Sequence, residues 1–192
     1  NINSQLSFAR THIIGADLAT SIAGIGFWAE AAAFIPEKDM IMTNDLSAFY
    51  PMSPEPVTQD SLILDKTKPY IKFVVGGDYN FSDGSYLNLQ YMHGFVHERG
   101  AENLNDYFFL RFEKKFFNEK LKVAPIGGGF IVTDWNNLKD NYALVYMPEI
   151  AYKPTINSEI TLSTVIFGGK GDNLFANLKD YNMLMFKMKY SF

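Results

Sequence analysis

The chain has 192 residues, with 17 Lys and Arg residues against 21 Asp and Glu residues, so its formal charge is −4 at pH 7. This acidic balance excludes a nucleic-acid binder that works through a basic surface. The complete lack of cysteine excludes a disulfide scaffold, a thiolate metal site and a cysteine nucleophile. Apolar residues make up 47% of the chain, which is too many for a disordered segment.

No stretch of the sequence is long and apolar enough to form a membrane-spanning helix. The best candidate runs from Ile22 to Ile35, contains Glu30 and falls short of the roughly 18 residues that such a helix needs. The first residue is Asn1 rather than Met, and no signal-peptide pattern precedes the first strand-like segment. We therefore expect either a processed chain or a fragment.

Apolar and polar residues alternate with a period of two along most of the chain, which predicts β-strands. The final segment is the clearest case, because Leu184, Phe186 and Met188 alternate with Lys187 and Lys189. In chain order the predicted strands are 12–20, 25–34, 69–81, 87–95, 105–117, 121–132, 141–153, 159–167 and 182–192. We expect an all-β fold with about nine antiparallel strands.

Three local signals refine this pattern. Ser82-Asp83-Gly84 has turn chemistry and predicts a hairpin between the third and fourth strands. Pro148 lacks a backbone donor and weakens the strand predicted at 141–153. The glycines at 127–129 predict a bulge or a site of close packing.

Short and long connections alternate between these strands. The short ones are 21–24, 82–84, 117–120 and 154–158, and the long ones are 35–68, 96–103, 133–140 and 168–179. Short turns therefore share one end of the sheet and long loops the other. Many of the predicted strands have about 10 residues or more, and such strands with this alternation are typical of a transmembrane β-barrel, in which the apolar face meets lipid.

Aromatic residues gather next to the short-turn end, where a barrel carries an interfacial girdle. They are Tyr79, Phe81, Phe116, Phe117, Tyr152, Tyr190 and Phe192.

The terminal Lys189-Tyr190-Ser191-Phe192, preceded by alternating apolar residues, resembles the C-terminal strand of Gram-negative outer-membrane barrels. Segments 76–81, 86–91 and 104–107 are also similar to porin-like barrels of the alginate-export type or a related porin family. The resemblance implies a transmembrane antiparallel up-and-down β-barrel in the bacterial outer membrane. It also implies that Tyr190 and Phe192 belong to the signal read by the barrel-assembly machinery.

Single-chain bacterial barrels have an even number of strands, with both termini on the periplasmic side. Nine strands that begin by running toward the short-turn side depart from this rule, so we expect at least one further strand before Asn1. Residues 1–192 then form a single β-barrel domain or, as the resemblance implies, the C-terminal part of a larger barrel of about 14 to 18 strands.

Charged residues on the polar side of the strands are the candidate lining of a water-filled lumen. They are Lys72, Asp78, Arg111, Glu113, Lys115, Glu149, Lys153, Lys187 and Lys189. Six are basic and three acidic, which predicts a mild preference for anions. The alternative is that they form cross-strand ion pairs and solvated lumen residues.

The long loop at about 35–68 contains four prolines and a mixture of aromatic and acidic residues. Loops of this length are commonly functional or disordered. One long loop often folds inward in porin-like barrels, and Asp45, Phe49, Tyr50 and Glu55 are the candidates to line such a constriction. The alternative is an external loop.

The sequence offers little support for an enzyme. His93 and His97 lie about 13 Å apart along an extended strand, so we expect no metal site there. The segment Gly168-Gly169-Lys170-Gly171-Asp172 lacks the ending of a phosphate-binding loop and reads as a flexible external loop. Asp172 and Asn173 lack the remaining ligand spacing of a calcium loop. We expect no cofactor.

The leading hypothesis is an outer-membrane channel that passes small hydrophilic solutes. The second is a structural or partner-binding barrel, either a sheath around another protein or one whose surface loops bind a partner. A soluble β-sandwich or ligand-binding barrel is a third possibility, against which strand length and Phe192 argue. Expected partners are outer-membrane lipid, the barrel-assembly machinery, small solutes, and a second copy or a barrel-completing chain, but not nucleic acid.

Overall fold

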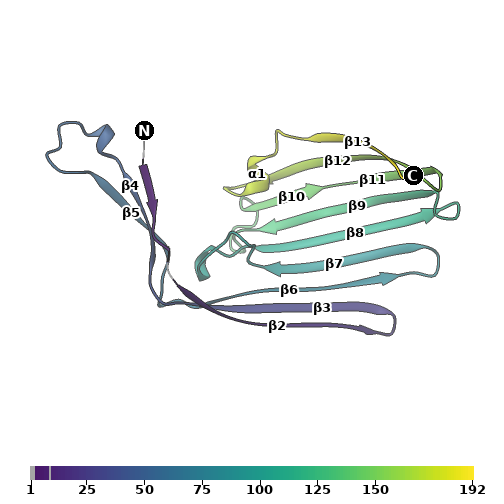
Figure 1. The fold of residues 1–192 in the computed structure, drawn as a ribbon, viewed down its shortest axis with the longest axis horizontal. Helices are drawn as coiled ribbons and strands as arrows, with labels where there is room; N and C mark the ends of the chain where they lie inside the picture. The colour runs from purple at the N-terminus through teal and green to yellow at the C-terminus, as the bar shows by residue number, and fades with distance from the viewer. Residues whose placement is uncertain (1–2, 9) are drawn as a thin grey trace. The chain divides into compact units, whose positions relative to one another are not determined.

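The computed structural model describes residues 3–8 and 10–192 and shows an all-β protein, as the alternation predicts (Figure 1). Its strands are β1 (Asn3–Leu6), β2 (Thr11–Ile22), β3 (Ile25–Pro36), β4 (Met40–Asp45), β5 (Thr58–Leu64), β6 (Tyr70–Asn80), β7 (Ser85–His93), β8 (Asp106–Phe116), β9 (Leu121–Val132), β10 (Tyr142–Tyr146), β11 (Glu149–Thr155), β12 (Ser158–Lys170) and β13 (Met183–Tyr190). Short helices are η1 (Ser47–Phe49), η2 (Ala101–Asn103) and α1 (Leu174–Asn177).

The chain divides into two compact units. The smaller unit comprises Asn1–Ala16, Ala31–Lys72 and Gly94–Leu104, and the larger unit comprises Asp17–Glu30, Phe73–His93 and Asn105–Phe192. The strands form two sheets, one of three strands in the order β1-β4-β5 and one of ten strands.

The ten strands of the large sheet occupy nine hydrogen-bonded rows. Along the sheet the order is β13, β12, β10 with β11, β9, β8, β7, β6, β3 and β2. Strands β10 and β11 share one row, because both pair with β9 on one side and with β12 on the other. Every register recorded in the sheet is antiparallel.

The single strand predicted at 141–153 is therefore interrupted. Met147 and Pro148 separate β10 from β11, and Pro148 cannot donate to a neighbouring strand. The break is compensated, since the Met147 amide donates to the Gly127 carbonyl at 2.6 Å and the Pro148 carbonyl accepts from the Thr164 amide at 3.2 Å.

The segment predicted as a long loop at 35–68 contains two strands, so the prediction of a plain loop is wrong there. Strand β4 pairs with β5 and, on its other side, with β1. A small core of Met40, Leu64 and Tyr70 anchors this region, and the ring of Phe34 stacks on that of Tyr70 at 4.9 Å. The contacts that stabilise this hairpin come from distant parts of the chain, so local alternation did not reveal it.

The predicted division between short turns and long loops is confirmed within the large sheet. Turns of two to four residues join β2 to β3, β6 to β7, β8 to β9 and β11 to β12. Left-handed backbone closes three of them, at Ala23-Gly24, at Gly84 and at Phe117-Asn118-Glu119. All four turns lie at one end of the strands, because consecutive strands are antiparallel.

Strand β6 ends in the predicted turn, which Asp83 closes with two hydrogen bonds. Its carboxylate accepts from the Lys114 ammonium at 2.7 Å and from the Ser85 amide at 3.0 Å. These two contacts, the lysine first, lower the pKa of Asp83 from 3.8 to about 2.

Because the folded chain lowers this pKa, the stabilisation is present above the unfolded value of 3.8 and is lost as pH falls toward about 2. We expect Asp83→Asn to lower the midpoint of thermal unfolding near neutral pH, with a difference from the unmodified chain that shrinks across that interval. Thermal unfolding followed by circular dichroism measures it, with the exposed loop variant Asp180→Asn as the control. A difference that stays constant with pH would contradict the assignment.

Candidate functional site

The register of the large sheet assigns every side chain to one of two faces, because residues directly opposite each other in neighbouring strands point to the same side. Asp78 lies opposite Asn88, and Asn88 lies opposite Arg111. Lys122 lies opposite Lys115 and Ala151, and Thr161 lies opposite Ala151 and Lys187. We call this side the polar face and the opposite side the apolar face.

All nine predicted lumen residues have the strand parity of the polar face. Most of them lie toward the short-turn end in the larger unit: Asp78, Arg111, Glu113, Lys115, Glu149, Lys153, Lys187 and Lys189. Lys72 differs, because its ammonium donates to the carbonyls of Phe95 and Glu98 within the smaller unit and lies 5.5 Å from the ring centroid of Phe34.

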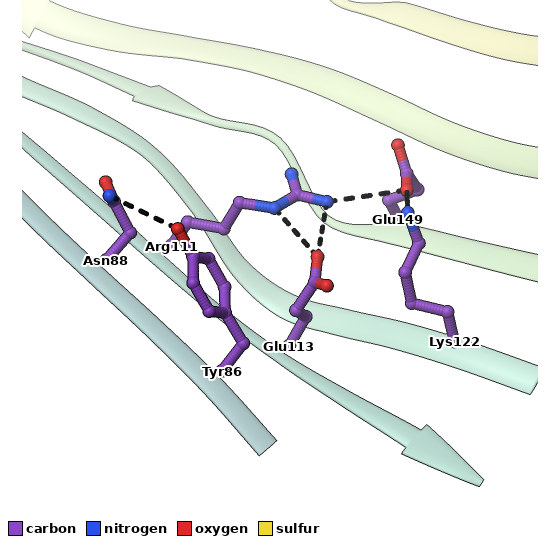
Figure 2. Close-up of polar contacts among 6 residues, drawn as sticks. All are labelled: Tyr86, Asn88, Arg111, Glu113, Lys122 and Glu149. Atoms are coloured by element: carbon purple, nitrogen blue, oxygen red, sulfur yellow. Dashed lines mark hydrogen bonds and ion pairs between the residues drawn. The ribbon is translucent and has the colours of Figure 1, made fainter. Parts of the chain in front are cut away.

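Arg111 is the centre of the charged cluster on the polar face (Figure 2). Its Nε donates to Glu113 Oε2 at 3.0 Å, and its Nη2 lies 2.9 Å from the same oxygen. Nη2 also reaches Glu149 Oε1 at 3.5 Å, and Lys122 Nζ lies 2.8 Å from that second oxygen. Two cations and two carboxylates from β8, β9 and β11 therefore neutralise one another.

Gly127 is the residue of β9 that the Arg111 side chain passes on its way to Glu149. It lies directly opposite Arg111 on β9, so no side chain stands between Arg111 and β11. A Cβ at this position would lie 2.6 Å from the Met147 carbonyl oxygen. The predicted close packing at the glycine triplet is thus confirmed, and the close neighbour is the Met147 backbone, whereas a Cβ would lie 3.8 Å from Arg111 Nη1.

A second polar group lies beside the charged cluster. The Tyr86 hydroxyl donates to Asp78 Oδ2 at 3.1 Å and accepts a long hydrogen bond from Asn88 Nδ2 at 3.4 Å. Asp78 lies over Gly26, where a Cβ would approach its carboxylate to 2.3 Å. Glycine at position 26 therefore gives the Asp78 carboxylate its space.

The lysines nearest the short turns are less fully neutralised. Lys115 pairs with Glu119 at 3.1 Å, and Lys153 lies 3.9 Å from Glu159. Lys187 and Lys189 form no ion pair with any residue that the structure describes. In the β12–β13 register, Lys189 lies opposite Glu159, the residue that Lys153 also approaches, and Lys187 lies opposite Thr161.

The four predicted constriction residues lie in the smaller unit. Asp45 ends β4 and accepts from the Ser47 amide at 2.9 Å, and hydrogen bonds from Ser47 lower the pKa of Asp45. Phe49 lies in η1, and Tyr50 and Glu55 follow it in an exposed loop between β4 and β5. All four residues therefore belong to the β4–β5 hairpin and its connecting loop.

Tyr190 and Phe192, the predicted assembly signal, lie at the short-turn end of β13. Their ring centroids are 5.7 Å apart, and both side chains are exposed. Ser191 between them donates its amide to the Asn157 carbonyl at 2.9 Å. This bond fixes the terminal aromatic pair beside the β11–β12 turn.

The apolar face is exposed to an extent that is unusual for a protein surface. On β13 the side chains of Leu184, Phe186 and Met188 are 72%, 65% and 69% exposed. Other exposed members on the larger unit are Leu18, Ile22, Ile25, Phe27, Leu89, Leu110, Ile126, Leu144, Ile150, Leu162 and Ile166. The alternation therefore produces a broad apolar surface that this chain does not cover.

The long-loop end of the apolar face carries a polar and aromatic cluster around Asp106. Its carboxylate accepts from the Tyr91 hydroxyl at 2.6 Å and from Trp135 Nε1, and His93 Nδ1 lies 2.8 Å away. The ring of Phe108 stacks on that of Tyr91 at 4.9 Å. Aromatic residues therefore border the apolar face at this end as well as at the short-turn end.

The sequence reasoning missed this cluster, as well as Lys122 and Tyr86, and it identified Gly127 as a close-packing site but not as a neighbour of Arg111. The only available signal was the strand pattern, which identifies a face but not the partner across the sheet. Among residues 3–8 and 10–192, no helix is long and apolar enough to cross a membrane. Within the same residues, no group of three or more candidate ligands could hold a metal ion.

Comparisons with known proteins leave the family open. No protein-family model matches this chain, and no significant match is found among curated proteins or solved structures.

Substitution of Gly127 tests the close approach of β9 to the Met147 backbone. We expect Gly127→Ala to lower the free energy of unfolding by about 1–3 kcal/mol, because the added Cβ meets a backbone carbonyl. Gly168→Ala is the matched control, since nothing lies within 4 Å of a Cβ there. Denaturant unfolding of both variants measures the difference, and equal stability of the two would contradict the packing assignment.

Proposed function

We propose that this chain forms part of a transmembrane β-barrel in a bacterial outer membrane, with the polar face lining a channel for small hydrophilic solutes. The observation that carries the proposal is the division of one sheet into two unlike faces. One face is a broad exposed apolar surface bordered by aromatic residues, and the other bears ion pairs from several strands. Water would solvate the charged side chains of the polar face, and lipid hydrocarbon would cover the side chains of the apolar face.

The dimensions of the strands fit a bilayer. Strand β8 has 11 residues, and at about 3.4 Å per residue with a tilt of about 40° such a strand spans roughly 27 Å. The apolar band of outer-membrane barrels is about 25 Å tall. Asp106 and Phe116, at the two ends of β8, then lie at the two interfaces.

The edges of the sheet point to further strands. In the described residues, β2 and β13 are each paired on one side alone, and a sheet edge in hydrocarbon would leave backbone donors unsatisfied. Strands β2 and β13 occupy the first and ninth rows, so they run in the same direction. A barrel with antiparallel pairs throughout therefore needs an odd number of additional strands, supplied by additional polypeptide or a partner.

The polar face suits passive transport rather than chemistry. Arg111, Glu113, Lys122 and Glu149 compensate one another, which fixes their side chains and leaves little net charge in the middle of the face. Lys187 and Lys189, which form no ion pair among the described residues, lie toward the short-turn end, where they would raise the local concentration of anions. We therefore expect a mild anion preference.

The two tryptophans test the assignment of the faces. Trp28 lies over Gly76 on the polar face, whereas Trp135 contacts Phe108 on the apolar side at a ring distance of 6.2 Å. In liposomes, we expect brominated lipid to quench the fluorescence of the Trp28→Phe variant, which retains Trp135. We expect aqueous iodide to quench the Trp135→Phe variant more than brominated lipid does. The reverse pattern would contradict the proposal.

The anion preference has its own test in planar-bilayer recordings of the full-length protein. We expect Lys187→Gln/Lys189→Gln to shift the reversal potential in a salt gradient toward cation selectivity. Lys66→Gln/Lys139→Gln, in the β5–β6 and β9–β10 connections, removes the same charge and should leave the reversal potential nearly unchanged. Cation selectivity of the unmodified protein would contradict the preference, and the absence of any conductance would contradict the channel.

A further inference from the structure

The polar face changes character along its length. Toward the long-loop end, its residues are apolar and covered rather than charged and hydrated: Ala143 is 0% exposed, Ile131 3% and Val165 7%. Ile131 lies opposite Ala143 in the register, so they share this face with Phe109 and Phe167. An apolar patch on a water-lined face needs something to cover it.

Over β10 and β12 the cover comes from the connection between β12 and β13. Residues 171–182, which we call the inward segment, contain α1. The ring centroid of Phe175 lies 5.9 Å from that of Phe167, and Ala176 is 5% exposed. Figure 1 shows α1 beside β12 and β10, at the long-loop end of these strands.

Polar contacts fix the inward segment at both of its ends. Asn173 caps α1 by accepting from the Ala176 amide at 2.9 Å, and its own amide donates to the Lys170 carbonyl at 3.1 Å. At the far end, Asn182 Oδ1 accepts from the Phe167 amide at 2.9 Å. Both ends are therefore tied to the backbone of β12.

Gly171 gives the chain the sharp turn that brings the segment back over the sheet. Its φ is +86°, and a Cβ there would approach the Asp140 carbonyl oxygen to 2.8 Å. The side of the segment away from the sheet carries exposed Asp172, Asn177 and Lys179. The inward segment thus presents apolar residues to the sheet and polar residues to the other side.

We propose that the inward segment narrows the passage along the polar face and sets the upper size of the solutes that pass. This inference rests on the proposed channel function and makes it more specific. It assigns the constriction to residues 171–182 rather than to the β4–β5 hairpin that holds Asp45, Phe49, Tyr50 and Glu55. The segment occupies volume over the polar face, which in a lumen would otherwise be filled by water.

The experiment replaces residues 173–180 with Gly-Ser-Gly and compares single-channel conductance in planar bilayers. We expect conductance to rise at least 1.5-fold, and larger polyethylene glycols to enter the pore. Replacing residues 48–56 with Gly-Ser-Gly, at the tip of the β4–β5 hairpin, is the matched control. Unchanged conductance in the first variant, or a comparable rise in the control, would overturn the proposal.

A second test uses point substitutions, so it does not depend on whether the shortened chain folds. Ala143→Cys places a thiol beneath the segment, in a chain without other cysteines. We expect this thiol to react slowly with a polar maleimide and at least several-fold faster once Phe175→Ala is added. Equal reaction rates would overturn the proposed cover. If the unmodified protein forms no channel, the proposed function itself fails, whatever the thiol reports.

Discussion

Backbone pairing in one fixed register is the constraint on which the rest of the structure depends. The nine rows pair antiparallel, and side chains alternate between the two faces along a strand. If one strand shifted by one residue against its neighbour, its charged side chains would move to the apolar face and its apolar side chains to the polar face. Ion pairs that cross two strand boundaries, such as Arg111 to Glu149, are compatible only with the observed register. The register therefore fixes the chemistry of both faces together.

The charged cluster illustrates how a long side chain can be used across a sheet. Arg111 reaches beyond its immediate neighbour, past Gly127 on β9, and Lys122 supplies a second cation to the shared Glu149. Such mutual compensation restrains the side chains while keeping them hydrated. A face of this kind suits a solute path, whereas the covered apolar patch near Ala143 suits a fixed boundary to that path.

Much of the fold could be predicted from the sequence, because strand alternation and turn chemistry are local. The hairpin at Ser82-Asp83-Gly84, the long polar connections and the polar-face parity of Arg111 and Lys187 all follow from short windows. Lys122 and Gly127 could not be identified as partners of the cluster, since pairing across strands depends on register and on the bulge near Phe112. The β4–β5 hairpin and the inward segment depend on contacts between residues distant in sequence.

Cysteine accessibility along β13 tests the central claim most directly, because the chain contains no cysteine of its own. Single cysteines at successive positions from Leu184 to Lys189 would be treated with a charged, membrane-impermeant maleimide after reconstitution into liposomes. The account predicts that cysteines at 185, 187 and 189 react, whereas those at 184, 186 and 188 are protected by lipid and react only after the bilayer is dissolved. Equal reactivity at all positions, or recovery of the folded protein in aqueous buffer without detergent, would contradict it.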